Sequence, residues 1–233
     1  MGEGDGIESR TASARALPQL RTVLVCDLVD STALIERLGD RRGSDCIRRH
    51  DRLARELLQR HGGREIDKTD GFLALFDRPV QAVAFALDYQ RSLHDPDAAG
   101  ESLRARVGIH VGEVMVWENS RSEVAGGAKA VEVEGLAKPV AARLMSLARP
   151  GQILLSGVAQ NLAQRAQGDL GEVAAHVRWL THGRYRFKGV PAPMLVHEVG
   201  EVGVAPLTAP GSSTKVQREL PWWRSPGALA LEA

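Results

Sequence analysis

Two segments, residues 22–32 (TVLVCDLVDST) and 64–76 (REIDKTDGFLALF), most constrain what this chain can fold into. The first has the apolar pattern of a buried strand, and that pattern stops at Asp27. The second contains two β-rich runs about a short turn with Asp70 and Gly71, which predicts a β-hairpin. If the first strand pairs beside this hairpin, Asp27 and Asp70 meet at one edge of the sheet. Two neighbouring carboxylates repel each other unless a cation lies between them, and hard oxygen ligands suit Mg²⁺ or Mn²⁺.

The order of the other patterns predicts the fold class. Apolar residues at helical spacing predict helices over 32–38, 43–61, 79–93 and 137–148, and a helix with a loop over 157–175. Further strands are expected at 103–117 (as a pair broken near Gly112), 130–134, 151–156, 177–187 and 194–199, with a polar loop at 118–128. This β-α-β-β-α-β order predicts an α+β fold. We expect a ferredoxin-like split βαβ palm core with extra C-terminal strands and helices, and an antiparallel-rich sheet with helices on one face.

Composition excludes several function classes. The chain has 30 basic and 29 acidic residues, so no general charge attracts it to nucleic acid or to an anionic membrane. Aromatic residues are only 4% of the chain, which argues against base-stacking platforms for single strands. Cys26 and Cys46 fall within a predicted strand and a predicted helix, where we expect small buried side chains. The sequence shows neither a signal peptide nor an apolar run of about 18 residues, so we expect a cytoplasmic domain without a membrane span.

Three regions differ in character along the chain. Residues 1–19 have no periodicity and are expected to form a flexible N-terminal segment. The catalytic domain is expected over 20–203, and residues 204–233 are expected to form a Pro/Gly-rich tail or linker. The end of that tail, RELPWWRSPGALALEA, has the aromatic residues and flanking cation found near membrane spans, but its apolar run is too short to span. A tether to a membrane in a longer parent protein is therefore one interpretation, and a disordered tail is the other.

Five segments together resemble a known family. They are VCDLVDST, GGREIDKTDGFLALF, RVGIHVGEV, EVEGLAKPVAARLMSLARPGQILLS and HGRYRFKGV. In order and spacing they resemble the catalytic domain of class III nucleotidyl cyclases, the adenylyl and guanylyl cyclases, over roughly residues 20–200. The resemblance implies a head-to-tail homodimer with shared active sites and a purine nucleoside triphosphate as substrate. It further implies that the ribose 3′-hydroxyl attacks the α-phosphate and that pyrophosphate leaves.

The resemblance assigns roles to residues on both protomers. Asp27 and Asp70 match the two metal-binding aspartates, which hold two divalent cations, Mg²⁺ or Mn²⁺. Arg106, in RVGIH, matches an arginine that contacts phosphate. From the partner protomer, Arg143 matches the transition-state arginine and Lys188 matches the lysine that holds the terminal phosphates.

The backbone after Asp27 supports phosphate binding on physical grounds as well. Residues from Leu28 through Ser31 to Thr32 lead into a predicted helix, whose first N–H groups have no partner within the helix. Such N–H groups bind phosphate oxygens.

Pro139 departs from the family pattern. It occupies the position of an asparagine four residues before Arg143, and proline has neither a side-chain donor nor a backbone N–H. Loss of one such preorganised donor costs on the order of 100-fold in rate. Lys138 is adjacent and is a candidate replacement cation.

The residues that would read the purine leave two alternatives open. The hairpin turn is one residue shorter than the family pattern, so either Asp67 or Lys68 enters the pocket, because neighbouring strand residues face opposite sides. Lys68 would donate to adenine N1, and Glu132 would accept from the adenine amino group. Asp67 would instead accept from the N1–H and amino groups of guanine. The combination of Lys68 and Glu132 favours ATP.

The sequence therefore predicts an adenylate cyclase that converts ATP to cyclic AMP. The alternatives are a guanylate cyclase, and a nucleotide-binding regulatory module that barely turns over because Pro139 replaces the asparagine. A structural interaction domain without nucleotide is the remaining alternative.

Overall fold

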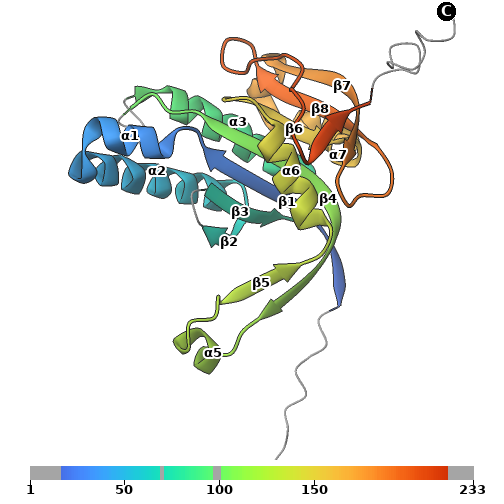
Figure 1. Ribbon diagram of the computed structural model, residues 1–233. Helices are drawn as coiled ribbons and strands as arrows, with labels where there is room; N and C mark the ends of the chain where they lie inside the picture. The colour runs from blue at the N-terminus through green and yellow to red at the C-terminus, as the bar shows by residue number, and fades with distance from the viewer. Residues whose placement is uncertain (1–16, 69–70, 97–100, 220–233) are drawn as a thin grey trace, which may run out of the picture.

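Strand β1 (Pro18–Leu28) lies inside the sheet and pairs antiparallel with both β3 (Gly71–Phe76) and β4 (Ala105–Glu118) (Figure 1). The protein is described here from a computed structural model, which describes residues 17–68, 71–96 and 101–219. Within these ranges nine strands form one sheet in the order β2-β3-β1-β4-β6-β8-β7-β9, with β5 paired to β4. The one parallel pair among the described strands is β4 with β6. The predicted α+β, mostly antiparallel fold is confirmed.

The remaining elements follow the predicted order closely. The strands are β2 (Arg64–Lys68), β5 (Val131–Glu134), β6 (Ile153–Ser156), β7 (Val177–Phe187), β8 (Met194–Glu201) and β9 (Val216–Arg218). The helices are α1 (Ser31–Leu38), α2 (Asp40–Arg60), α3 (Pro79–His94), α5 (Arg121–Ala125), α6 (Ala137–Leu147), α7 (Gly157–Arg165) and the 3₁₀ segment η1 (Gln167–Ala175). None of the helices in the described ranges combines the length and the apolarity needed to cross a lipid bilayer.

Alternation along β1 separates two cores. Leu24 and Cys26 face a core that they share with α2, α3 and α7, whereas Val23 and Val25 face the opposite side, where α6 packs. The expectation that helices cover one face alone is therefore wrong, because α6 covers the other face. Glycine makes this packing possible: a Cβ at Gly108 of β4 would overlap backbone atoms of α6.

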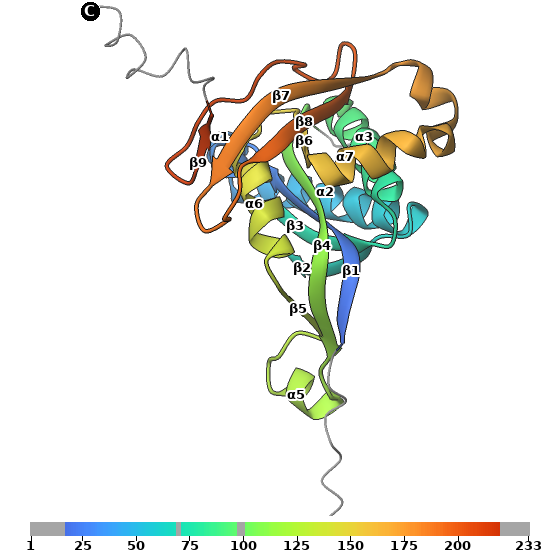
Figure 2. The same ribbon diagram turned by 90° about the vertical axis from the view of Figure 1, so that its right-hand side faces the viewer.

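Strand β4 is unbroken, contrary to the predicted pair with a break near Gly112. Gly112 lies within the ladder opposite Arg21, and an added Cβ there would lie 3.0 Å from the Cβ of Ala137. The glycine thus admits the start of α6 rather than a turn. The far end of β4 continues with β5 and α5 into an arm that projects from the body of the domain (Figures 1 and 2).

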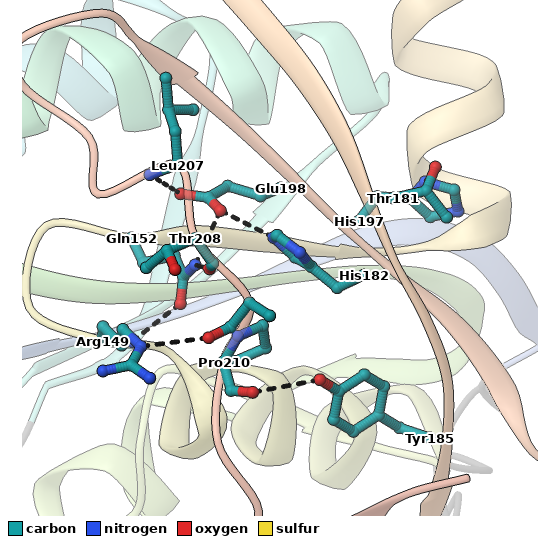
Figure 3. Close-up of polar contacts among 11 residues, drawn as sticks. Arg149, Gln152, Thr181, His182, Tyr185, His197, Glu198, Leu207, Thr208 and Pro210 are labelled. Atoms are coloured by element: carbon teal, nitrogen blue, oxygen red, sulfur yellow. Dashed lines mark hydrogen bonds and ion pairs between the residues drawn. The ribbon is translucent and has the colours of Figure 1, made fainter. Parts of the chain in front are cut away.

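The segment after β8 packs on the sheet, although the sequence indicated a tail or linker from residue 204. Strand β9 pairs with β7, and Val216 is fully buried. A buried carboxyl, Glu198, accepts hydrogen bonds from His182, from Gln152 and from the N–H of Leu207 (Figure 3). The bond from Leu207 and the pairing of β9 with β7 thus attach the segment after β8 to the sheet.

Candidate active site

Asp27 lies near the end of β1, where its register partners are Gly71 on β3 and Arg106 on β4. Its partly buried side chain lines a cavity of about 290 Å³. The other lining residues come from β1, β2, β3 and α6: Val25, Cys26, Asp67, Gly71, Phe72, Leu73 and Met145. Gly71 is required here, because a Cβ at this position would overlap the carbonyl of Cys26.

Asp70, the second predicted metal ligand, lies outside the described residues, and its pairing with Asp27 stays a prediction. The neighbouring Gly71 is the register partner of Asp27. No group of three or more His, Cys, Asp and Glu side chains that could hold a metal occurs among the described residues. The donor chemistry at Asp27 nevertheless fits a hard divalent cation, because the carboxylate faces the cavity and already holds a cationic group.

That cationic group is Arg106. Its Nη2 donates to Oδ2 of Asp27 at 2.6 Å. The Nε of Arg106 is buried and has no hydrogen-bond partner among the described residues. Arg106 therefore lies beside the carboxylate with one buried donor unpaired, and its role in phosphate binding stays a prediction.

The three positions predicted to bind phosphate, Leu28, Ser31 and Thr32, differ in whether their backbone N–H groups are available. The Leu28 side chain is buried in the core, and the chain there is still within the β1–β4 ladder. Asp30 has a left-handed conformation (φ 54°) and precedes α1 without capping it by a side-chain bond. Ser31 and Thr32 open α1, so their N–H groups are the ones available to an anion.

Asp67 and Lys68 point to opposite sides of the sheet, and the structure shows which faces the cavity. Asp67 pairs in register with Leu73 and lines the cavity that Asp27 also lines. Lys68 pairs with Phe72 on the other side, and its Nζ lies 2.7 Å from Oδ2 of Asp51 on α2. Lys68 and Glu132, which were expected to share an adenine pocket, do not line the same cavity in the described part of the chain.

A second cavity of about 270 Å³ adjoins the first and shares Asp67 and Leu73 with it. Glu132 lines this cavity and accepts a hydrogen bond from Asn119 at 2.8 Å. Lys129 and Lys138 line it as well, and the Nζ of Lys129 lies 2.5 Å from Oδ2 of Asp67. Sequence reasoning missed Lys129, because nothing in a polar loop marks the one residue that folds back onto the sheet.

Arg143 and Lys188 lie apart from the Asp27 cavity within the chain, since neither is among its lining residues. Arg143 projects from α6 so that its Nη2 lies 3.9 Å from where a Cβ of Gly189 would be, next to Lys188. Neither side chain has a hydrogen bond or ion pair to another described residue. The Arg143 guanidinium thus lies beside the backbone segment that carries Lys188, and neither residue lines the Asp27 cavity.

Pro139 is the third residue of α6. Its missing N–H costs the helix nothing in the first turn. Lys138 donates to the carbonyl of Val133 and to Glu134, both at 3.2 Å, and so is held at the rim of the second cavity.

No family model matches the chain. Solved structures do match it. An adenylate cyclase of Trypanosoma brucei in its monomeric state aligns with a TM-score of 0.64 and 22% identity, covering 85% of this chain and 97% of the other. The guanylyl cyclase Cya2 gives a TM-score of 0.63 and 23% identity, covering 84% and 98%. The chain has the class III nucleotidyl cyclase fold.

Curated relatives extend this finding at the level of sequence. An uncharacterised protein of Mycobacterium tuberculosis is 31% identical over 183 residues, which is 76% of this chain. A protein named adenylate cyclase from Glutamicibacter nicotianae is 28% identical over 162 residues, or 69% of this chain. The chain spans about half the length of the M. tuberculosis relative (55%) and a third of the Glutamicibacter one (34%).

Proposed function

We propose that the protein is a nucleotidyl cyclase that forms a 3′,5′-cyclic nucleotide and pyrophosphate from a purine nucleoside triphosphate. The observation that carries this proposal is the Asp27 carboxylate at the end of β1, open to a cavity and bonded to Arg106. In a nucleotidyl cyclase a carboxylate at this position can bind a ligand in the cavity. An ion pair with a purely structural role would not require an adjoining cavity.

The residues of one copy bind the triphosphate and the cations. Asp27, with Asp70 as its predicted partner, would hold two divalent cations, Mg²⁺ or Mn²⁺. Bound cations would lower the pKa of the ribose 3′-hydroxyl and offset the triphosphate charge. Arg106 exchanges its bond to Asp27 for a phosphate oxygen, and the N–H groups of Ser31 and Thr32 bind further oxygens.

A second copy completes the site in this proposal. Arg143 and Lys188 have no partners among the described residues and do not line the Asp27 cavity of their own copy, so a twin molecule can present them to its neighbour's cavity. Arg143 stabilises the charge that develops on the α-phosphate as the 3′-oxygen attacks, and Lys188 holds the terminal phosphates. Pro139 supplies no donor, so we expect slow turnover.

Asp67 favours guanine as the preferred base. It faces the cavity, where its carboxylate accepts from the N1–H and amino groups of guanine, while Lys129 beside it can donate to O6. Lys68, which would have favoured adenine, is bonded to Asp51 on the other side of the sheet. We therefore propose GTP as the preferred substrate.

ATP is the second candidate, and Glu132 is the observation that favours it. Its carboxylate lines the second cavity and would accept from the adenine amino group. A donor to adenine N1 would then have to come from Lys129 or Lys138, which line the same cavity.

A product assay tests the proposal. The purified protein is incubated with Mn²⁺ and either GTP or ATP, and cyclic nucleotides are quantified by mass spectrometry. We expect cyclic GMP in excess of cyclic AMP. Asp27→Asn should abolish both products with unchanged thermal unfolding, whereas Asp77→Asn, an exposed control on the loop after β3, should leave them unchanged. No product from either nucleotide, with nucleotide still bound, would instead indicate a regulatory module.

A further inference from the structure

Two ion pairs join α2 to β2. The Nζ of Lys68 lies 2.7 Å from Oδ2 of Asp51, and the guanidinium of Arg55 bonds to both carboxylate oxygens of Glu65, at 2.7 and 3.0 Å. Asp51 and Arg55 are four residues apart and so lie one turn apart on the same side of α2. Helix α2 thus presents a negative group, Asp51, and a positive group, Arg55, to β2. The residues of β2 that face them carry the opposite charges.

These pairs flank an irregularity in the ladder. The register between β2 and β3 shifts between Glu65 and Asp67, so Ile66 is the extra residue of a bulge. A register shift of one residue exchanges the two faces of a strand. The bulge therefore determines which residue faces the cavity: with Ile66 as the extra residue, Asp67 lies opposite Leu73 and Lys68 lies opposite Phe72.

Asp51 is itself held in place by buried groups. His50 is 2% exposed, and burial lowers the pKa of its imidazole, which leaves the ring neutral with a single N–H. The Tyr89 hydroxyl lies 2.6 Å from Nε2 of His50 and donates to it, so Nδ1–H is left to donate to Oδ1 of Asp51 at 3.1 Å. Both oxygens of Asp51 are thus occupied, one by His50 and one by Lys68. The carboxylate has one orientation that satisfies all its partners.

We propose that Asp51 and Arg55, with Lys68 and Glu65, form a register clamp that selects Asp67 as the residue that reads the purine. The proposal rests on the proposed cyclase function, and it makes Asp51 and Arg55 positioning residues that act from the far side of the sheet. Because Lys68 is held against α2, its neighbour Asp67 must face the cavity. The two members on α2 thereby determine substrate specificity without contact with the substrate.

Variants of the clamp test this inference through the preference between purines. Asp51→Asn keeps the shape of the side chain and removes its charge, and Asp45→Asn is a matched control, because Asp45 lies on the same helix with an exposed partner, Arg48. We expect Asp51→Asn to reduce the ratio of kcat/KM for GTP over ATP by about tenfold and Asp45→Asn to leave it unchanged. The charge-exchanged pair Asp51→Lys with Lys68→Asp should recover part of the ratio.

A second measurement does not depend on turnover. Acetylation of Lys68, followed by mass spectrometry, should be several-fold faster in Asp51→Asn than in the wild-type protein, with the exposed Lys215 as an internal reference. Binding of 3′-deoxy-GTP and 3′-deoxy-ATP gives the purine preference without cyclisation. If the wild-type protein binds nucleotide but makes no product, the proposed function fails while the clamp is still judged by this preference.

Two results would overturn the clamp. One is faster acetylation of Lys68 with an unchanged preference between GTP and ATP, in turnover and in binding. The other is acetylation of Lys68 at the wild-type rate in Asp51→Asn, which would show that Asp51 does not hold Lys68. Failure to bind either nucleotide would also refute a role in specificity.

Discussion

Arg106 bonds to Asp27 across adjacent strands, with 2.6 Å between Nη2 and Oδ2, and the two residues are direct register partners. The carboxylate predicted to hold a metal is thus already paired with the cation predicted to bind phosphate. Binding of a metal–nucleotide complex would separate them, since each then gains a partner of opposite charge. This relationship leads to the first prediction.

Arg106→Gln should raise KM for the triphosphate about tenfold or more, because a charge-assisted bond to phosphate is lost. The apparent affinity for Mn²⁺ should not fall, since the variant also removes a competitor for Asp27. Steady-state kinetics with varied nucleotide and varied Mn²⁺ separates the two effects. Arg165→Gln, an exposed charge on α7, is the control. Weaker Mn²⁺ binding in Arg106→Gln would contradict this account.

Gly108→Ala should disturb the helix that carries Arg143. An added Cβ at position 108 would overlap the backbone of α6 at Ala141 and Met145, and overpacking of this kind costs about 1–3 kcal/mol or more. We expect a lower free energy of unfolding in urea and a disproportionate loss of kcat. Gly168→Ala, where an added Cβ meets no atom within 4 Å, should behave like the wild-type protein. Equal effects of both substitutions would show that α6 does not depend on Gly108.

Glu198→Ala should destabilise the C-terminal strands. It leaves His182, Gln152 and the N–H of Leu207 without their buried acceptor, and loss of one member of such a group costs about 3–5 kcal/mol. Urea unfolding measures this cost, and Glu172→Ala on the surface is the control. Similar unfolding free energies for the two variants would argue against a role for Glu198 in attaching the segment after β8.

The buried imidazole of His110 should make the free energy of unfolding depend on pH. Burial lowers the pKa of its imidazole to about 4, and Nδ1 lies 2.8 Å from Oγ of Ser156. As pH falls from 6.5 to about 4, the unfolded chain takes up a proton here that the folded chain does not. The free energy of unfolding therefore falls by up to about 1.4 kcal/mol per pH unit from this group.

Urea unfolding at pH 7.5 and pH 5 tests this, with His110→Asn compared with the wild-type protein. The loss on acidification should be smaller in the variant, and an exposed control, His94→Asn, should lose as much as the wild-type protein. If the free energy of unfolding of His110→Asn falls on acidification by as much as that of the wild-type protein, protonation of His110 in the unfolded chain does not cause the loss.

Much of the fold could be predicted from the sequence, because the spacing of apolar residues and the residue types in turns indicate where helices and strands begin and end. The β1 strand, the hairpin and the helix over α3 were confirmed with shifts of a few residues at their ends. The break near Gly112 was wrong, because a glycine that admits a packed helix looks the same in sequence as a glycine in a turn. Helix α5 was missed although Ser120 and Glu123 form the capping box that marks such a start.

In the candidate site, the sequence could predict only the positions that follow from the strand on which a residue lies and from the pairing of that strand with its neighbours. Asp27 and Arg106 lie together as neighbouring strands require. The choice between Asp67 and Lys68 depended on a bulge and on two ion pairs to α2, which are tertiary features that no local pattern records. For the same reason the sequence favoured ATP, whereas the placement of Asp67 favours GTP.

In the proposed mechanism two copies of this chain share a cyclase site, with Asp27 from one copy and Arg143 from the other. Asp27→Asn and Arg143→Ala proteins are assayed alone and after mixing and re-equilibration at equal concentration, with cyclic nucleotide as the readout. Each variant alone should be inactive, and the mixture should recover about a quarter of wild-type activity, because half of the dimers then contain one intact site of two. A mixture as inactive as its components, with heterodimers demonstrably formed, would show that Asp27 and Arg143 do not act in one shared site.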